Sequence, residues 1–243
     1  MFQRPFLQSG VLFCVAVLTA ACGPRAHIPP RPAHPELLPD AIASSDPSAR
    51  LARALAPVLF IQRDEYFPLD RIVAVVHPTR PVIAYHLLWR DDVHGSWIPS
   101  TVPTDEEIVW VGYDNTGAPT DLWTFWHGSV LHTPWKNKGG VAVDVQWGKH
   151  GSLPRGVVES DLPRMKKLNE FYAYTRLGEW DILLGNLTRP GPTCFCYSYG
   201  RYREFTKPFI TADHIDAVAR TTDATPVLAT VFGWPYSRKR PWP

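Results

Sequence analysis

Residues 107–128, EIVWVGYDNTGAPTDLWTFWHG, hold two β-strand patterns on either side of a turn. The runs 107–114 and 120–128 are rich in Val, Ile and aromatic residues, which favour strands. Between them, the Asp, Asn, Gly and Pro residues of 113–121 are typical of a hairpin loop. This stretch therefore predicts two neighbouring antiparallel strands.

Three further runs of the same kind lie at 71–77, 81–89 and 141–148. They are separated from one another and from the hairpin by turn-forming residues. Short strands at such spacing are typical of all-β domains. The sequence therefore predicts a mainly β fold, an antiparallel β-sandwich.

Helical patterns are few and peripheral. Residues 45–58 begin with a capping Ser or Asp and carry Leu at helical spacing, so a short helix is expected to lead into a strand. The pattern over 159–175 predicts a helix, and a weaker one is expected over 211–220. The tail 233–243 is expected to be irregular. One or two helices should thus lie at the periphery of the sandwich.

The composition fits one globular domain of ordinary core size with a short attachment. Of the 243 residues, 45% are hydrophobic and 20% are charged, which excludes disorder over the whole length. The 25 Lys and Arg residues nearly balance the 23 Asp and Glu residues, so the charge gives no reason to expect a nucleic-acid partner. The 25 Pro and 10 Trp residues, beside only 2 Met, favour a loop-rich β architecture.

The first 21 residues predict a signal peptide. Arg4 precedes the apolar run 10–21, which is short for a membrane-spanning helix. The sequence LTAAC at 18–22 resembles the lipobox of bacterial lipoproteins, in which the cysteine, here Cys22, is lipid-modified. A plain cleaved signal is the alternative, because Thr19 stands where leucine is more usual.

The lipobox resemblance implies a place in the cell envelope. Gly23 rather than Asp after the cysteine favours an outer-membrane lipoprotein, anchored by acyl chains such as palmitate and facing the periplasm or the exterior. Residues 22–47 are rich in Pro and lack apolar periodicity, which predicts a tether. Residues 48–243 then form a single β-sandwich-like domain.

Histidines end two of the predicted strands. His127 ends the run 120–128 and His150 follows the run 141–148, each beside a Gly. The linker between the two strands contains His132, so three imidazoles are expected at one rim of the sandwich. Acidic residues lie before or after neighbouring strands: Asp91, Asp92, Asp105, Glu106 and Glu107. The predicted ligand-binding residues are Asp92, His94, Glu107, His127, His132 and His150.

Imidazole and carboxylate groups together suit a divalent cation, or a general acid and base pair acting on a polar ligand. The predicted metal ligands are Glu107, His127 and His150, with Ca²⁺ or Mg²⁺ as the ion. The alternative is that the histidines bond loop backbone and the acids are solvated turn residues. No HExxH or CxxC motif is present. The distance between the His127 and His150 rings decides between a cation site and a structural role, since rings more than about 10 Å apart cannot share one ion.

Cys194 and Cys196 are separated by one residue, in the sequence CFC. A disulfide between them would close a small, strained ring. A soft-metal pair and two buried free thiols are the other readings, and all three stay open.

The order of motifs in residues 48–156 resembles the vacuolar-protein-sorting-associated family, through LARALAPVLFIQRDEYFPLD, EEIVWVGYD, WHGSVLHTPW and VDVQWGKHGSLP. That family is distantly similar to the necrosis-inducing, cytolytic proteins of plant-associated microbes. The resemblance implies a β-sandwich and a divalent cation held by His and acidic side chains. It places Asp64 and Glu65 in an opening motif, Glu106 or Glu107 at the head of a strand, and His127 and His150 as facing histidines.

The chain departs from the cytolysins in one motif. Their His-rich heptapeptide GHRHDWE is absent, and residues 90–107, RDDVHGSWIPSTVPTDEE, occupy the comparable region.

Three functions are consistent with these observations. The first is an envelope lipoprotein whose His and acid rim binds a glycan or a lipid head group, through a divalent cation. The second is a metal-assisted hydrolase with Glu107 or Asp92 as base. The third is a structural envelope lipoprotein without a small-molecule site.

Overall fold

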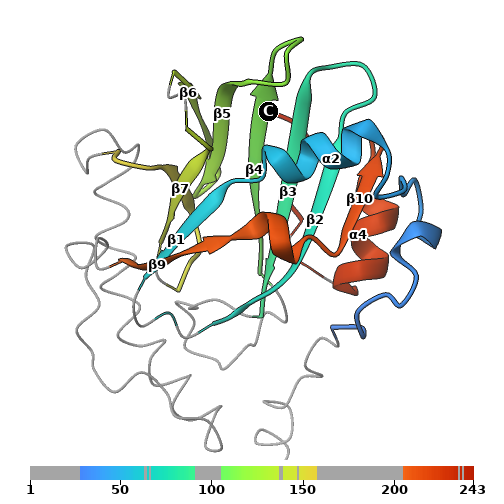
Figure 1. The fold of residues 1–243 in the computed structure, drawn as a ribbon. Coiled ribbons are helices and arrows are strands. Elements are labelled where there is room, and N and C mark those ends of the chain that lie inside the picture. The colour runs from blue at the N-terminus through green and yellow to red at the C-terminus, as the bar shows by residue number, and fades with distance from the viewer. Residues whose placement is uncertain are drawn as a thin grey trace, which may run out of the picture.

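The structure is a computed structural model, and it describes residues 28–62, 65, 67–90, 105–136, 139–146, 148–157, 205–234, 236 and 238–243. Within these residues the chain forms two β-sheets that pack face to face (Figure 1). The predicted β-sandwich is therefore confirmed. Both sheets are mixed rather than wholly antiparallel, because each contains one parallel pair of strands.

The larger sheet has six strands in the order β10, β2, β3, β4, β5, β6. Its strands are β2 Leu69–Val76, β3 Val82–Trp89, β4 Asp105–Tyr113, β5 Pro119–Trp126, β6 Ser129–Pro134 and β10 Ala217–Arg220. Neighbours along the chain pair antiparallel from β2 to β6, and β10 adds to β2 in parallel. Four of the five predicted runs lie in this sheet, including the hairpin of β4 and β5.

The smaller sheet has four strands in the order β8, β7, β1, β9. Its strands are β1 Val58–Gln62, β7 Ala142–Val145, β8 Ser152–Pro154 and β9 Phe205–Ile210. The parallel pair here is β1 with β7, whose strands lie more than 80 residues apart in the sequence numbering. Only β1 and β7 were expected from local patterns.

Alternation of side chains builds the core between the two sheets. Leu59, Val143 and Val145 of the smaller sheet are fully buried against residues such as Val109 and Leu122 of the larger one. Helix α2, Pro47–Ala54, extends the smaller layer, begins at the capping side chain of Asp46, and packs over β2 and β10. The hydroxyl of Tyr85 donates to the Ala52 carbonyl at 2.7 Å and fixes this helix on the sheet.

A third layer covers the opposite face of the larger sheet. Helix α4, Thr225–Phe232, lies on it with Leu228, Val231 and Phe232 buried. Tyr236 and residues 238–243 continue over the same face, where the Trp110 indole donates to the Pro241 carbonyl at 2.9 Å. These residues contain no helix or strand in the part of the tail that the structure describes, as predicted.

The expected helix over 211–220 is wrong. Only Thr211–His214 form a helical turn, the 3-10 helix η4, and Ala217–Arg220 are strand β10. Ala217, Val218 and Ala219 point alternately to the two faces of the sheet and are all buried. A surface helix would bury only one of its faces, so these residues fit a strand covered on both sides. Helix α4 was not predicted, although its buried residues Val227, Leu228, Val231 and Phe232 recur at helical spacing, because a pattern of two turns is short for a helix signal.

The segment 28–46, assigned to the tether by its composition, contacts the domain. It contains the 3-10 helix η1, Pro35–Leu37, and Ala41 forms a bridge to Ala219. The Ile42 amide donates to the Val218 carbonyl at 2.9 Å, and Ile28 packs on the third layer. This part of the segment therefore lies along the edge strand β10.

Several predictions fall on residues outside the described ranges. They are the signal peptide with Cys22, the helix over 159–175, the cysteines Cys194 and Cys196, and the site residues Asp64, Asp92 and His94. Among the described residues, no helix is both long and apolar enough to span a membrane.

Candidate functional site

Charged side chains converge at the end of the sandwich where β3 and β5 end and β4 begins. They come from the loop after β1, the start of β4, the loop between β7 and β8, and the C-terminal segment. We call these residues the acidic-end cluster: Glu65, Asp105, Glu107, His150 and Lys239. None of them is more than partly exposed, so the cluster lies under the surface.

His150 is the centre of this cluster. Its ring is fully buried, with Nδ1 3.0 Å from Asp105 Oδ2 and Nε2 3.3 Å from Glu65 Oε1. The ring stacks on Trp89 at 4.1 Å between centroids and 3° between planes. Burial works to lower the pKa of His150, but the Glu65 carboxylate and the hydrogen bond to Asp105 outweigh it and raise the pKa to about 9.

At neutral pH, His150 is therefore an imidazolium whose two N–H groups face carboxylates. An imidazolium has no lone pair for a metal ion. Its backbone, at φ 53°, is held by the bond from its own amide to the Gln146 carbonyl at 3.0 Å. The turn between β7 and β8 thus presents the ring to the core.

Glu65 is fixed by backbone donors. The Phe67 amide donates to Oε1 at 3.0 Å, and the Gly148 amide donates to Oε2 at 2.8 Å. This carboxylate thereby links the loop after β1 to the loop before His150. Both oxygens of Glu65 thus accept hydrogen bonds from backbone amides, which favours a structural role over binding of a ligand.

Glu107 is the unusual member of the cluster. It shares a face of β4 with Asp105, and Lys239 Nζ lies 3.3 Å from Glu107 Oε1 and 3.9 Å from Asp105 Oδ1. Burial raises the pKa of the Glu107 carboxyl to about 8, despite the opposing effect of Lys239. Its other oxygen, Oε2, is buried without a hydrogen-bond partner. The carboxylate is therefore short of positive charge and donors.

Lys239 reaches the cluster from the third layer. Its amide donates to Glu106 Oε2 at 3.0 Å, and Glu106 also bonds to His86 Nδ1 at 2.6 Å on the outer face of β4. Burial works to lower the pKa of Lys239, and the neighbouring Glu107 and Asp105 overcome it and raise it. Lys239 was missed from the sequence because a cation in an irregular tail gives no local signal of its contacts.

His127 occupies a turn rather than a strand face. It and Gly128 have φ of 44° and 83° and form the two-residue loop between β5 and β6. Its Nε2 lies 2.7 Å from Gln146 Oε1, and burial lowers the pKa of the ring to about 4. His127 is therefore neutral at pH 7, and Gln146, the partner of its Nε2 atom, differs from the carboxylate partners of His150.

His132 lies at another place, on the outer side of the larger sheet. Its Nε2 is 2.7 Å from Asp121 Oδ1, and its ring stacks on Trp123 at 4.8 Å and 14°. The predicted residues thus divide into Glu107 and His150 in the acidic-end cluster, His127 beside it on Gln146, and His132 apart.

The predicted divalent cation is tested by the chemistry of these donors. Among the described residues, no three His, Cys, Asp or Glu side chains are placed to hold one ion together. His150 is occupied by two carboxylates and does not fit as a ligand. The oxygens of Asp105 and Glu107 do fit a hard cation, since Mg²⁺ is commonly bound through one or two carboxylates and keeps several waters.

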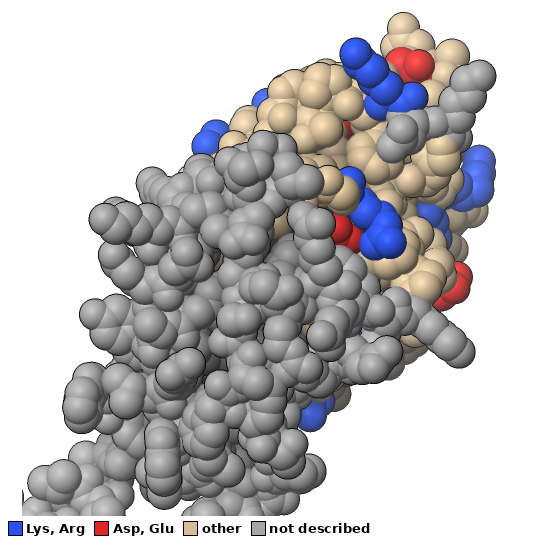
Figure 2. Space-filling model, turned by 90° about the vertical axis from the view of Figure 1, so that its left-hand side faces the viewer, with Lys and Arg blue, Asp and Glu red and all other residues tan. Residues whose placement is uncertain are grey.

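Asp105 and Glu107 contribute little to the surface, since their exposed fractions are 6% and 5%. On the face that Figure 2 shows, the visible acidic side chains form small separate patches, and Lys and Arg side chains are scattered among uncharged atoms.

No protein-family model matches this chain, and no curated protein matches it. Solved structures do show likeness. "NLPPya in complex with mannosamine" is 13% identical with a TM-score of 0.35, and "NLPPya in complex with glucosamine" is 14% identical with a TM-score of 0.36. "Toxin fold for microbial attack and plant defense" is 14% identical with a TM-score of 0.35. Each comparison covers 51% of this chain and 76% of the other.

These structures belong to the necrosis- and ethylene-inducing-like toxins, the group that the sequence motifs resemble, and the resemblance is distant. We assign no site or function from a likeness of this size.

Proposed function

We propose that this chain binds a polar ligand, a glycan or a lipid head group, through a divalent cation at the start of β4. The observation that supports the proposal is the buried Oε2 atom of Glu107, which has no hydrogen-bond partner. Asp105 supplies a second carboxylate on the same face of the strand. Ca²⁺ and Mg²⁺ both take carboxylate oxygens, and both leave positions for water and a ligand.

Charge balance favours a cation at this place. The cluster holds three carboxyl groups and two cationic side chains, and the third carboxyl remains neutral by keeping its proton up to a pKa of about 8. A divalent cation would replace that proton and the Lys239 ammonium as the partner of Glu107. Lys239 is therefore the residue with which the ion competes.

The experiment is calorimetric titration of the intact chain with CaCl₂ and with MgCl₂. Because Glu107 must lose its proton, affinity should rise about tenfold per pH unit below about pH 8 and then level off. Glu107→Gln should abolish binding, whereas Glu36→Gln, an exposed residue of η1, should leave it unchanged. Absence of binding to either ion at about pH 8.5, or binding that survives Glu107→Gln, would contradict the proposal.

The ligand is then sought with the cation present. The probes are phosphatidylglycerol vesicles for the head group and an array of soluble glycans for the sugar. Binding that is lost on chelation and in Glu107→Gln supports the cation as the link between the protein and its ligand.

The same carboxyl favours a second function, hydrolysis. A buried acid with a pKa of about 8 beside a fixed ammonium exchanges its proton near neutral pH, as a general base or acid requires. Turnover of aryl glycosides or aryl esters, with an inflection near pH 8 that Glu107→Gln removes, would support it. Cation binding without turnover would exclude hydrolysis and support ligand binding as the function of the site.

We also propose that lipid on Cys22 attaches the protein to the outer membrane. The support is the lipobox-like sequence LTAAC followed by Gly23. Labelling of growing cells with an alkyne analogue of palmitate tests it, because Cys22→Ser should remove the label and release the protein from the membrane fraction. Label that persists in Cys22→Ser would exclude this site of attachment.

A further inference from the structure

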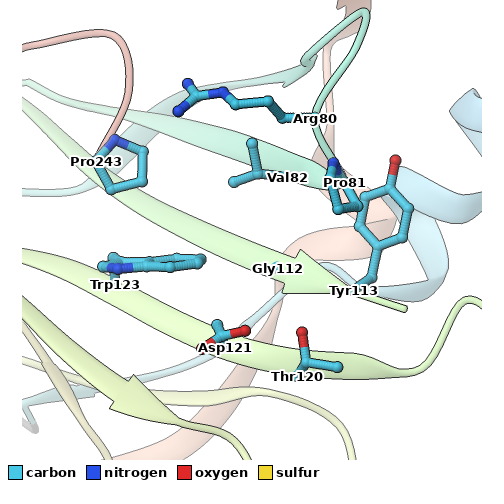
Figure 3. A pocket seen from close by; sticks show the side chains of 9 residues that line it. All are labelled: Arg80, Pro81, Val82, Gly112, Tyr113, Thr120, Asp121, Trp123 and Pro243. Carbon is cyan, nitrogen blue, oxygen red and sulfur yellow. The ribbon is translucent and has the colours of Figure 1, made fainter. Parts of the chain in front are cut away.

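A pocket of about 300 Å³ lies at the other end of β4 from the acidic-end cluster. Its walls are the hairpin between β2 and β3, the end of β4, the start of β5 and the last described residue of the chain (Figure 3). The lining residues are Arg80, Pro81, Val82, Gly112, Tyr113, Thr120, Asp121, Trp123 and Pro243. Glu107 and Gly112 are five strand positions apart, or about 17 Å.

Trp123 forms one wall of the pocket as a flat ring. Figure 3 shows the indole opposite Val82, with the pocket between them. His132 stacks on Trp123 at 4.8 Å and 14°, which supports the ring in this orientation. The indole therefore presents an apolar, planar surface to whatever enters.

Gly112 leaves room for this arrangement. A Cβ atom at this position would lie 3.0 Å from the Trp123 ring and 3.0 Å from the Asp121 Cβ. Such contacts are tighter than nine in ten real Cβ contacts, so the indole or Asp121 would have to shift by a few tenths of an ångström to admit a side chain. The glycine thus lets the ring lie directly over the backbone of β4.

Polar groups surround this apolar wall. Asp121 accepts from His132 through Oδ1, which leaves the other carboxylate oxygen to accept from a ligand hydroxyl. Arg80 extends over the opposite side, and Tyr113 and Thr120 carry hydroxyls at the edge (Figure 3). A planar apolar surface with a few donors and acceptors around it is the pattern of a small-molecule site, and the volume lies at the lower end of the range for such sites.

We propose that this pocket is a second binding site, for one neutral pyranose ring of a glycan. The C–H face of a pyranose is apolar and matches the indole of Trp123, while its ring hydroxyls match Asp121 and Arg80. A phosphate or carboxylate ligand is disfavoured because the Asp121 carboxylate faces it. A wholly apolar ligand is disfavoured because it would desolvate Asp121 and Arg80 without replacing their hydrogen bonds.

This site is independent of the proposed cation site. Its residues belong to the ends of β4 and β5 that lie away from Asp105 and Glu107, and no member of the acidic-end cluster lines the pocket. Failure of one proposal therefore leaves the other intact, provided that sugar binding is measured without added divalent cation.

The experiment is saturation-transfer NMR of the intact chain with the methyl pyranosides of glucose, mannose, galactose and N-acetylglucosamine, and with inorganic phosphate. At least one pyranoside should bind in the millimolar range, and phosphate should not. Trp123→Ala and Asp121→Asn should each reduce affinity at least tenfold, whereas Trp123→Phe should retain part of it. Glu36→Gln provides the matched exposed control.

Gly112→Ala tests whether sugar binding depends on the position of the Trp123 indole as well as on its presence. It keeps the indole and the Asp121 carboxylate and should still weaken binding, since the added methyl group shifts the indole or narrows the pocket. Thermal melting establishes that each variant is folded. The proposal is overturned if none of the pyranosides binds, if binding persists unchanged in Trp123→Ala, or if phosphate binds in their place.

Discussion

The two ends of strand β4 use charged residues in opposite ways. At its start, Asp105 and Glu107 are buried with His150 and Lys239, and each charge depends on its neighbours. At its end, the side chains of Asp121 and His132 are paired and are 32% and 48% exposed, so water also solvates their charges. Both ends thus carry a pair of His and Asp, which is buried at the start of β4 and keeps exposed surface at its end.

The largest expected effect is on stability. Asp105→Asn removes one charged partner of the buried His150 and should lower the free energy of unfolding by about 3 kcal/mol. Asp121→Asn, the same change in an exposed pair, should cost less than about 1 kcal/mol. Urea unfolding of both variants measures the difference. Equal effects would mean that the two ends do not differ in the way described.

Next in size is the pH dependence of stability. The pKa of His150 is raised to about 9 and that of Glu107 to about 8, so both groups bind protons more tightly in the folded chain. Their contribution is complete below the unfolded-state pKa of each group, and the free energy of unfolding should fall by about 2 kcal/mol for each pH unit between about pH 6.5 and about pH 9.

Unfolding in denaturant across this pH interval measures the fall. Glu107→Gln should make it shallower, because a neutral amide has no proton to lose. Asp121→Asn should leave the slope unchanged, since this exposed pair lies at the other end of the strand. A flat profile in the unaltered chain would show that neither buried group is coupled to folding as described.

A smaller effect concerns competition for Glu107. Lys239→Gln removes the ammonium that lies 3.3 Å from its carboxylate, so Ca²⁺ or Mg²⁺ should bind about tenfold more tightly. Calorimetric titration measures the change, with Arg238→Gln as the neighbouring control. Weaker ion binding in Lys239→Gln would indicate that the lysine organises the site rather than competing with the ion.

The smallest expected effect is that of His132, which stacks on the Trp123 indole, on sugar affinity. His132→Gln keeps a group that can bond to Asp121 but loses the stacked ring, and should reduce methyl pyranoside affinity about threefold. Its effect on the free energy of unfolding should stay below about 0.5 kcal/mol, as for other exposed changes. A loss as large as that of Trp123→Ala would assign His132 to direct contact with the sugar.

Local patterns were sufficient for most of the larger sheet. The Val, Ile and aromatic runs predicted β2, β3, β4 and β5 because each is buried by neighbours that are close in sequence. They failed for β10, whose strand partner within the described residues is β2, more than 140 residues earlier. A four-residue strand that completes a distant sheet has no hydrophobic period long enough to identify it.

The same limit applies to the candidate site. The sequence predicted that His127 ends a strand at the rim of the sandwich, and the structure shows that its backbone, at φ 44°, lies in a turn and directs the ring toward Gln146. The sequence predicted acidic groups near His150, and the structure shows which acids contact its ring: Asp105 and Glu65. The contacts of Lys239 depend on the path of the tail, which no local pattern specifies.

The path of that tail has a consequence for the molecule as a whole. Lys239 is bonded to Glu106, Pro241 to Trp110, and Pro243 lines the pocket beside Gly112, so five residues run alongside β4 from one end to the other. Residues 239–243 thus contact the acidic-end cluster at one end and line the pocket at the other. Removal of these five residues would therefore take Lys239 from the acidic-end cluster and Pro243 from the pocket wall at the same time.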